Sequence, residues 1–260
     1  MPMSFEEIRS VLTAPGQPFE IEQVNINGTE IRSWKNAQTD MAMILRQSLD
    51  YDERDYIVYR DERLSFSDHY AQVAALADKL VTQYKVEKGD RVAIAMRNFP
   101  EWSVAFWAAV SAGAVAVPLN AWWTSDELQY GLSDSGARIV FVDEERLARV
   151  QPVRAKLPEL QQVVAVRCDR LPEATLAFRQ LVRDASADRP LPAVGIQPED
   201  PATLFYTSGT TGFPKGTVGT HRNFCSVSVS MQYNGLQGAL RAGRTLEELA
   251  GQQITPAALL

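Results

Sequence analysis

The sequence has 260 residues, of which 45% are hydrophobic and 22% are charged, and this ordinary globular composition argues against a disordered chain or a disulfide scaffold. A formal net charge of −6 disfavours non-specific binding to nucleic acid or to an anionic membrane, so we predict no nucleic-acid partner. The two cysteines, Cys168 and Cys225, have no metal or redox spacing and indicate thiols in a reducing compartment, which favours a cytoplasmic protein.

The amino-terminal segment contains acidic residues and lacks a long apolar core, so we expect no secretory signal. Residues 102–125 carry no charge and are numerous enough to cross a membrane. They are rich in alanine, serine and glycine, however, and Gly113 and Pro118 interrupt them. We therefore predict a buried helix followed by a buried strand, and no transmembrane segment. Peripheral contact with a membrane stays open as an alternative.

Strand-like and helix-like patterns alternate through the middle of the chain. Residues 1–38 show no strong periodicity and are expected to form an arm. In chain order we then expect a helix at 41–49, strands at 56–59 and 64–66, a helix at 67–84, a strand at 91–96, a helix at 100–112, a strand at 114–119, a helix at 124–136, a strand at 139–142, a helix at 144–156 and a strand at 163–166. This βαβ spacing predicts an α/β fold with a mostly parallel sheet.

The carboxyl-terminal part begins after a segment rich in proline, alanine and aspartate. We expect a strand at 203–206, a loop of small residues, a helix at 221–237 and a short helix at 246–250. The predicted organisation is therefore an arm over 1–38, a first α/β subdomain over 39–185, a linker over 186–200, and over 201–260 the start of a second subdomain that holds the loop.

That loop has the composition of a phosphate-binding segment. Residues 206–216, YTSGTTGFPKG, contain three glycines, three threonines, a serine and a lysine directly after an apolar strand. Glycines let the backbone approach a ligand, while N–H groups, hydroxyls and a lysine suit polyphosphate oxygens. The Walker pattern is absent, because Lys215 follows Pro214 rather than a glycine, and the dinucleotide pattern is absent too. A flexible surface loop is the plain alternative.

Four segments together resemble the adenylate-forming (AMP-binding) superfamily, in its acyl-CoA synthetase branch. They read LFYTSGTTGFPKG at 204–216, NFPEW at 98–102, SAGAVAVPLNAWWTSDELQYGLSDSGARIVFVD at 111–143 and DERLSFSDHY at 61–70. The resemblance extends over about residues 40–237. It implies the amino-terminal portion of the adenylate-forming fold, an α/β structure with mostly parallel sheets flanked by helices, without the carboxyl-terminal domain of that family.

The resemblance also implies an activity and its ligands. Such enzymes use ATP and Mg²⁺ to adenylate a carboxylic acid and then transfer the acyl group to coenzyme A, and this branch implies a fatty acid, with an aryl or bile-acid-like acid as the alternative. Carried onto this chain, the resemblance assigns ATP and pyrophosphate binding to seven residues: Thr207, Ser208, Gly209, Thr210, Thr211, Gly212 and Lys215. Thr207 would also approach the Mg²⁺. Lys215 has a plain alternative as a solvated lysine.

The resemblance places the catalytic residues beyond Leu260. We therefore expect these 260 residues alone to be inactive as a ligase, and a non-catalytic remnant acting as a binding module is the alternative function. Oligomeric state stays open. His221 and Asn223 are expected to pack or cap a helix rather than to catalyse. Trp122 and Trp123 are assigned to the core by default, with a pocket wall as the alternative. The acidic run 143–145 is expected to be a solvated face.

Overall fold

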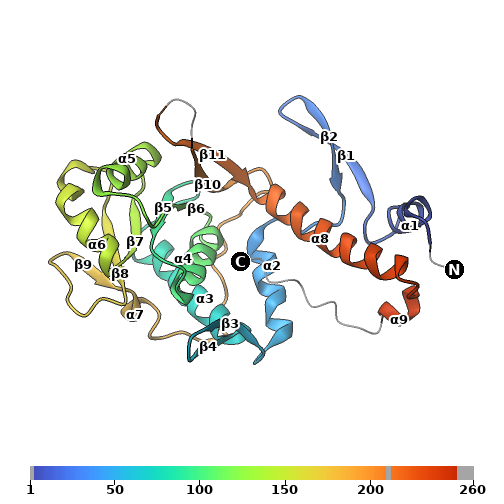
Figure 1. Cartoon of the computed structure of the whole chain (residues 1–260), viewed down its shortest axis with the longest axis horizontal. Helices are drawn as coiled ribbons and strands as arrows, with labels where there is room; N and C mark the ends of the chain where they lie inside the picture. The colour runs from blue at the N-terminus through green and yellow to red at the C-terminus, as the bar shows by residue number, and fades with distance from the viewer. Residues whose placement is uncertain (1–2, 209–211, 251–260) are drawn as a thin grey trace. The chain divides into compact units, whose positions relative to one another are not determined.

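The computed structural model describes residues 3–208 and 212–250. They belong to two compact units (Figure 1). Asp40–His221 form one, the sheet unit, and Met1–Thr39 with Arg222–Leu260 form the other, the terminal unit.

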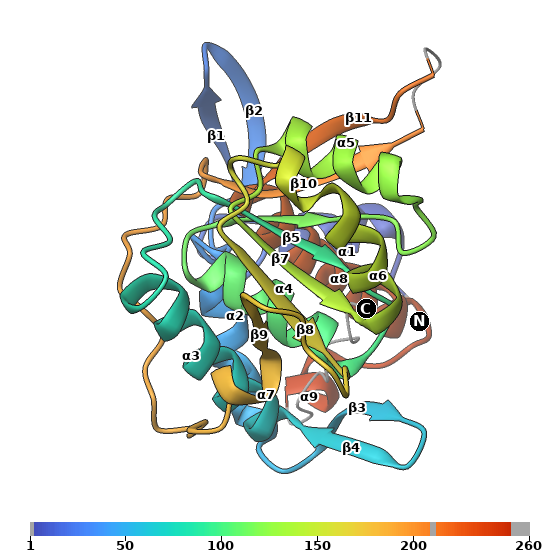
Figure 2. The same ribbon diagram turned by 90° about the vertical axis from the view of Figure 1, so that its left-hand side faces the viewer.

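A seven-stranded sheet is the centre of the sheet unit, with the strand order β11-β10-β6-β5-β7-β8-β9 (Figure 2). The bounds are β5 Arg91–Ala95, β6 Val115–Pro118, β7 Ile139–Asp143, β8 Gln162–Val166, β9 Thr175–Ala177, β10 Pro201–Thr207 and β11 Lys215–Thr220. All neighbouring strands are parallel except β11, which is antiparallel to β10. This confirms the predicted α/β fold with a mostly parallel sheet.

Helices cover the sheet, and α4, α5 and α6 connect consecutive strands from β5 to β8. Their bounds are α2 Met41–Gln47, α3 Phe66–Thr82, α4 Pro100–Ser111, α5 Ser125–Ser135, α6 Glu144–Val150 and α7 Phe178–Leu181. Helices α3 and α4 pack together, and α5 contacts α6. In β5, Ala93 and Ala95 join the core beneath α5 and α6, while Val92 and Ile94, which alternate with them in sequence, are also buried. Because alternate residues of a strand point to opposite faces, both faces of β5 are covered.

The local sequence explains where the helices begin and end. Thr124 accepts a hydrogen bond from the backbone of Glu127 and completes the predicted capping box of α5, which ends at Gly136 with a left-handed backbone. The predicted helix over 144–156 is only half α-helical. It changes at Gln151 into a 3-10 helix, Gln151–Lys156, because Pro152 has no N–H to continue the α-helical ladder.

Two further parts of the sheet unit lie outside the main sheet. Strands β3 (Asp55–Tyr59) and β4 (Glu62–Ser65) form an antiparallel hairpin, preceded by a short 3-10 helix at Ser48–Tyr51. Residues 182–200 contain no helix or strand, and all of them are described. This segment is tied to α3 by the ion pairs of Asp184 with Lys79 and of Arg189 with Asp78, so it follows the surface of the unit rather than leaving it.

The terminal unit contains more helix and strand than the weak periodicity of residues 1–38 predicts. Its elements are α1 Phe5–Leu12, β1 Ile21–Ile26, β2 Thr29–Trp34, most of α8 (His221–Arg241) and α9 Leu246–Ala250. The hairpin turns at Asn27 and Gly28, which both have positive φ, as a two-residue turn of this kind requires. Residues 1–38, predicted as an arm, thus contain a helix and a hairpin that their weak periodicity did not reveal.

A small apolar core explains why the two ends of the chain pack together. Ile8 and Leu12 of α1 belong to the same buried cluster as Val229 and Leu240 of α8. The indole N–H of Trp34 donates to the Ser230 hydroxyl at 2.9 Å. The predicted boundaries place α8 in one subdomain with the strand before it. Contacts between α8 and the distant residues 1–38 leave no local pattern from which a different boundary could be predicted.

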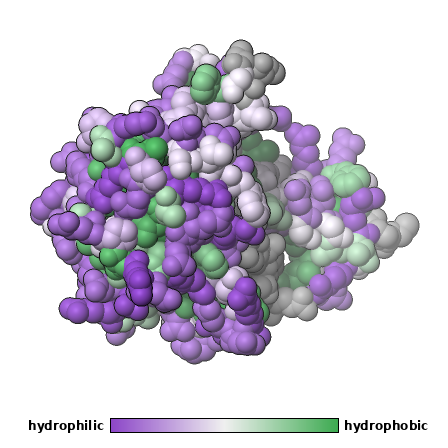
Figure 3. Space-filling model, turned by 60° about the vertical axis from the view of Figure 1, so that its left-hand side comes forward, coloured by the Kyte–Doolittle hydropathy of each residue, from purple (hydrophilic) through white to green (hydrophobic). Residues whose placement is uncertain are grey.

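Within the described ranges, no helix is both long enough and apolar enough to cross a membrane. The uncharged stretch 102–125 instead forms α4 and β6, which are separated at Gly113, where φ is +75°. On the face shown in Figure 3, hydrophilic side chains cover most of the surface and hydrophobic ones form small patches.

Candidate functional site: the carboxyl edge of the sheet

The carboxyl ends of four neighbouring strands, β10, β6, β5 and β7, lie along one edge of the sheet because these strands are parallel. From β5 the chain passes through α4 to β6 on one side, and from β7 it passes through α6 to β8 on the other. The strand order therefore reverses between β5 and β7. In open α/β sheets, ligands bind beyond the carboxyl ends at such a reversal.

The predicted phosphate loop lies at this edge, between β10 and β11. Thr207 ends β10 and is the register partner of Lys215, which begins β11. The Thr207 hydroxyl donates to the Lys215 carbonyl at 3.4 Å. Gly216 permits close packing here, since an added Cβ would lie 2.8 Å from Cδ1 of Leu204. The two stems are thus held in a fixed register while the loop extends beyond the sheet.

The structure brings the described members of the predicted site together. Thr207, Ser208, Gly212 and Lys215 are all exposed at this end of the β10–β11 hairpin. Gly212 has φ +95°, a conformation that favours glycine. Gly209, Thr210 and Thr211 lie outside the described residues. Exposed hydroxyls and one ammonium group on a glycine-containing loop fit the oxygens of a polyphosphate.

A cavity of about 380 Å³ opens at the same edge, beyond β5 and β6. It is lined by Tyr59, residues 97–99 and residues 120–122. The indole of Trp122 is 67% exposed, and the guanidinium carbon of Arg97 lies 4.2 Å from its ring centroid. Trp123, by contrast, is buried in the core beneath α5. The default assignment to the core is therefore correct for Trp123 and wrong for Trp122, which forms a wall of the cavity.

Behind this wall lies a buried ion pair. A carboxylate oxygen of Asp143 lies 3.1 Å from Nη1 of Arg146, and both side chains are at least 93% buried. Asp143 also caps α6 and accepts a hydrogen bond from the Arg97 backbone N–H at 2.9 Å. Among the described residues, Nη2 of Arg146 has no hydrogen-bond partner. The prediction of a solvated acidic face at 143–145 was thus wrong for Asp143, which is buried because it caps α6 and pairs with Arg146.

Arg167 contacts Tyr59 and Phe99, two further aromatic residues that line the cavity. Its guanidinium pairs with both carboxylate oxygens of Glu62, at 2.7 and 2.6 Å, and its Nε donates to Glu101 at 2.9 Å. The same guanidinium lies over the rings of Tyr59 and Phe99 at 5.2 and 5.0 Å. The hydrogen bond from Arg167 lowers the pKa of Glu62. This network fastens the β3–β4 hairpin beside the start of α4.

His221 is packed inside the sheet unit, and the acidic residues that the structure describes form no metal site. The His221 ring is buried, its Nδ1 accepts a hydrogen bond from the Met41 N–H at 3.2 Å, and burial lowers its pKa. These contacts agree with a packing role. Over residues 3–208 and 212–250, no cluster of three or more His, Cys, Asp or Glu side chains could hold a metal ion.

Comparison with known proteins adds a family and several relatives. The family model described as AMP-binding enzyme matches residues 45–245. The chain is 38% identical over 164 residues to the long-chain-fatty-acid–CoA ligase FadD13 of Mycobacterium tuberculosis, an alignment that covers 62% of this chain and 31% of that protein. It is 30% identical over 198 residues to 4-hydroxybutyrate–CoA ligase 2 of Metallosphaera sedula, covering 73% of this chain and 35% of that protein.

Solved structures agree with the fold. The anthranilate CoA ligase AuaEII in complex with anthranoyl-AMP superposes with a TM-score of 0.67 at 26% identity, covering 74% of this chain and 36% of that one. The chain therefore spans about a third of the length of the curated relatives it matches.

Proposed function

The chain belongs to the AMP-binding enzyme family, and on that premise we propose that it forms the phosphate-binding part of a carboxylic acid–CoA ligase. In this reaction the carboxylate attacks the α-phosphorus of ATP, which gives an acyl-adenylate and releases pyrophosphate. The thiol of coenzyme A then attacks the acyl carbon and releases AMP. The observation that carries the proposal is the fixed pairing of Thr207 with Lys215, which holds a glycine- and threonine-rich loop at the carboxyl edge of the sheet.

In this proposal the loop binds the β- and γ-phosphates of ATP. Lys215 supplies a positive charge, and the hydroxyls come from Thr207, Ser208, Thr210 and Thr211. The backbone N–H groups of Gly209 and Gly212 complete the set of donors. Preorganised donors of this kind stabilise the negative charge that develops on the leaving pyrophosphate.

Mg²⁺ fits this site through the phosphates rather than through a cage of protein ligands. The Thr207 hydroxyl is exposed and makes only a long 3.4 Å hydrogen bond, so it is available as a ligand. No acidic cluster that could hold a metal occurs among the described residues, and phosphate oxygens and water would supply the other ligands. When bound, the ion would neutralise charge on the transferred phosphates.

We further propose that the cavity beyond β5 and β6 takes the nucleotide end of coenzyme A. The exposed ring of Trp122, with the Arg97 guanidinium over it, offers a surface on which a base can stack, and the charge of Arg97 suits a phosphate. Cavity and loop share one edge of the sheet, as they must if the thiol is to reach an adenylate formed at the loop.

The acid that we propose is a fatty acid, which is supported by the 38% identity to a long-chain-fatty-acid–CoA ligase. An aryl acid is the alternative, because AuaEII is an anthranilate CoA ligase. We also propose that the 260 residues by themselves bind phosphate without completing the reaction. The alignment covers only 31% of the long-chain-fatty-acid–CoA ligase, and positioning by the remaining groups supplies much of an enzyme's rate. A purely binding role is the alternative function.

The proposal is tested by calorimetric titration of this chain with magnesium pyrophosphate and with MgATP. We expect saturable binding of both, and we expect Lys215→Met to weaken it about tenfold, as the loss of a charge-assisted hydrogen bond would. Lys156→Met, at an exposed lysine that ends the 3-10 helix Gln151–Lys156, is the control and should bind like the wild type. Absence of binding, or equal binding by both variants, would contradict the proposal. Assay of the same sample for acyl-CoA formation then tests the predicted inactivity.

A further inference from the structure

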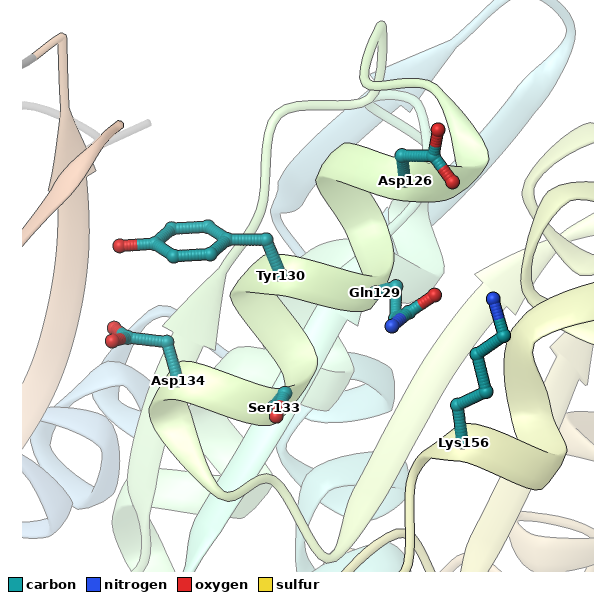
Figure 4. A pocket seen from close by; sticks show the side chains of 6 residues that line it. All are labelled: Asp126, Gln129, Tyr130, Ser133, Asp134 and Lys156. Carbon is teal, nitrogen blue, oxygen red and sulfur yellow. The ribbon is translucent and has the colours of Figure 1, made fainter. Parts of the chain in front are cut away.

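Helix α5 presents two side chains toward the β10–β11 hairpin, one helical turn apart. Figure 4 shows the ring of Tyr130 and the carboxylate of Asp134 projecting on the same side of α5, toward those strands, whereas Gln129 faces Lys156 on the other side. Residues four apart on a helix share one face, so α5 can contact two points of the hairpin at once.

Asp134 contacts the stem that enters the phosphate loop. Its carboxylate accepts a hydrogen bond of 2.6 Å from the hydroxyl of Tyr206, the residue before Thr207. The Tyr206 ring also packs edge-on against Trp123, with centroids 5.8 Å apart. Burial raises the pKa of the Tyr206 hydroxyl, and its hydrogen bond to Asp134 raises it further, so the hydroxyl stays protonated and donates at neutral pH.

Tyr130 contacts the stem that leaves the loop. Its hydroxyl donates to the carbonyl of Pro214, the residue before Lys215, at 2.9 Å. Its ring centroid lies 5.1 Å from that of Phe213, a side chain that is otherwise 66% exposed. The two contacts of α5 therefore fall directly beside the two residues that flank the loop, at Tyr206 before Thr207 and at Pro214 before Lys215.

We infer that Tyr130 and Asp134 are positioning residues for the phosphate loop, an inference that rests on the proposed function of that loop. A loop rich in glycine loses much conformational entropy when it closes around a ligand. Fixing both of its ends against one rigid helix removes part of that cost before the ligand arrives. Neither residue needs to touch the phosphates.

A purely structural role would have a different signature. Asp134 is exposed and Tyr130 is half-buried. Loss of one hydrogen bond at such positions changes global stability little, because exposed polar contacts contribute weakly. A positioning role predicts a change at the loop stems and in phosphate affinity, with unfolding hardly affected.

The test compares Tyr130→Phe and Asp134→Asn, the two brace variants, with two matched controls in this chain. Tyr84→Phe removes a hydroxyl from a half-buried tyrosine between α3 and β5, on the amino side of the sheet. Asp126→Asn removes a charge from the first turn of α5 itself. Each variant is measured for amide hydrogen exchange at Thr207, Lys215 and Gly216 without ligand, for affinity toward magnesium pyrophosphate, and for thermal unfolding.

We expect each brace variant to speed exchange at its own stem and to weaken pyrophosphate binding about threefold to tenfold, the range for one lost hydrogen bond. The controls should match the wild type. Unchanged exchange and affinity in both brace variants would overturn the inference while leaving the proposed function intact. Wild-type protein that binds no pyrophosphate would overturn the proposed function, and the exchange data would then still show whether α5 orders the stems.

Discussion

The two halves of the carboxyl edge are built in opposite ways. At the β10–β11 end, the candidate phosphate-binding residues follow one another within a single segment, and Thr207, Ser208 and Lys215 are exposed. Beyond β5 and β6, the cavity is assembled from separate segments and rests on the buried pair of Asp143 and Arg146. We therefore expect substitutions in the exposed phosphate loop to leave the stability of the fold unchanged. Substitution of the buried Asp143 or Arg146 should destabilise the sheet next to the cavity.

The largest effect that sharpens this comparison is expected from Arg146→Ala. The substitution leaves the carboxylate of Asp143 buried without its partner, which costs about 3–5 kcal/mol in comparable buried pairs. Urea unfolding measures the loss, and Arg170→Ala at an exposed position is the control. A loss below about 1 kcal/mol would mean that this pair does not support the cavity end of the sheet.

Close packing beneath α5 should give the next largest effect. An added Cβ at Gly131 would lie 2.6 Å from the Trp123 ring, so Gly131→Ala should destabilise the protein by about 1–3 kcal/mol through overpacking. Gly235→Ala is the control with the opposite sign. Gly235 lies in α8 with nothing within 4 Å of an added Cβ, and alanine there should stabilise the helix by about 0.5–1 kcal/mol. Thermal unfolding distinguishes the two, and equal shifts would contradict the packing described here.

A smaller effect separates the two halves by ligand. Trp122→Ala should weaken binding of adenosine 3′,5′-bisphosphate by about tenfold, because one stacking contact is lost. It should leave magnesium pyrophosphate affinity unchanged, and Lys215→Met should do the reverse. Calorimetric titration of each ligand into each variant checks this crossed pattern. If both variants lower the affinity for both ligands equally, the carboxyl edge holds one site rather than two.

The smallest effect concerns how stability depends on pH through the ion pair of Arg167 with Glu62. Arg167 lowers the pKa of Glu62 from its ordinary value of 4.5. A carboxyl group with a lowered pKa stabilises the folded state above its unfolded pKa, and this contribution is lost as pH falls through the folded value. Unfolding measured between pH 6 and about pH 3 should therefore show a steeper acid loss for the wild type than for Arg167→Met. Parallel curves would contradict the ion pair's role.

The parts that sequence predicted are those with local signals. Alternating strands and helices gave the α/β fold, and the capping pair Thr124 and Glu127 marked the start of α5. The loop at 206–216 could be singled out because its glycines, hydroxyls and lysine are contiguous. The Asn27–Gly28 turn was an equally local signal for the β1–β2 hairpin, but the weak alternation around it hid the strands.

The parts that sequence could not predict depend on distant contacts. Trp122 and Trp123 are adjacent and chemically identical, and only the direction of each side chain makes one a cavity wall and the other core. Asp143 stands in an acidic run that looks solvated until Arg146 and the backbone of Arg97 surround it. Likewise, the brace from Tyr130 and Asp134 joins α5 to strands more than 70 residues later.

The central claim is that the β10–β11 loop is a polyphosphate site distinct from the cavity beyond β5 and β6. The most direct measurement is an NMR titration of the chain with magnesium pyrophosphate, with the backbone amides assigned. The account predicts saturable shifts at Thr207, Ser208, Gly212 and Lys215, with the amides of Arg97 and Trp122 unmoved. Shifts confined to the cavity, or no shifts at the loop, would contradict it.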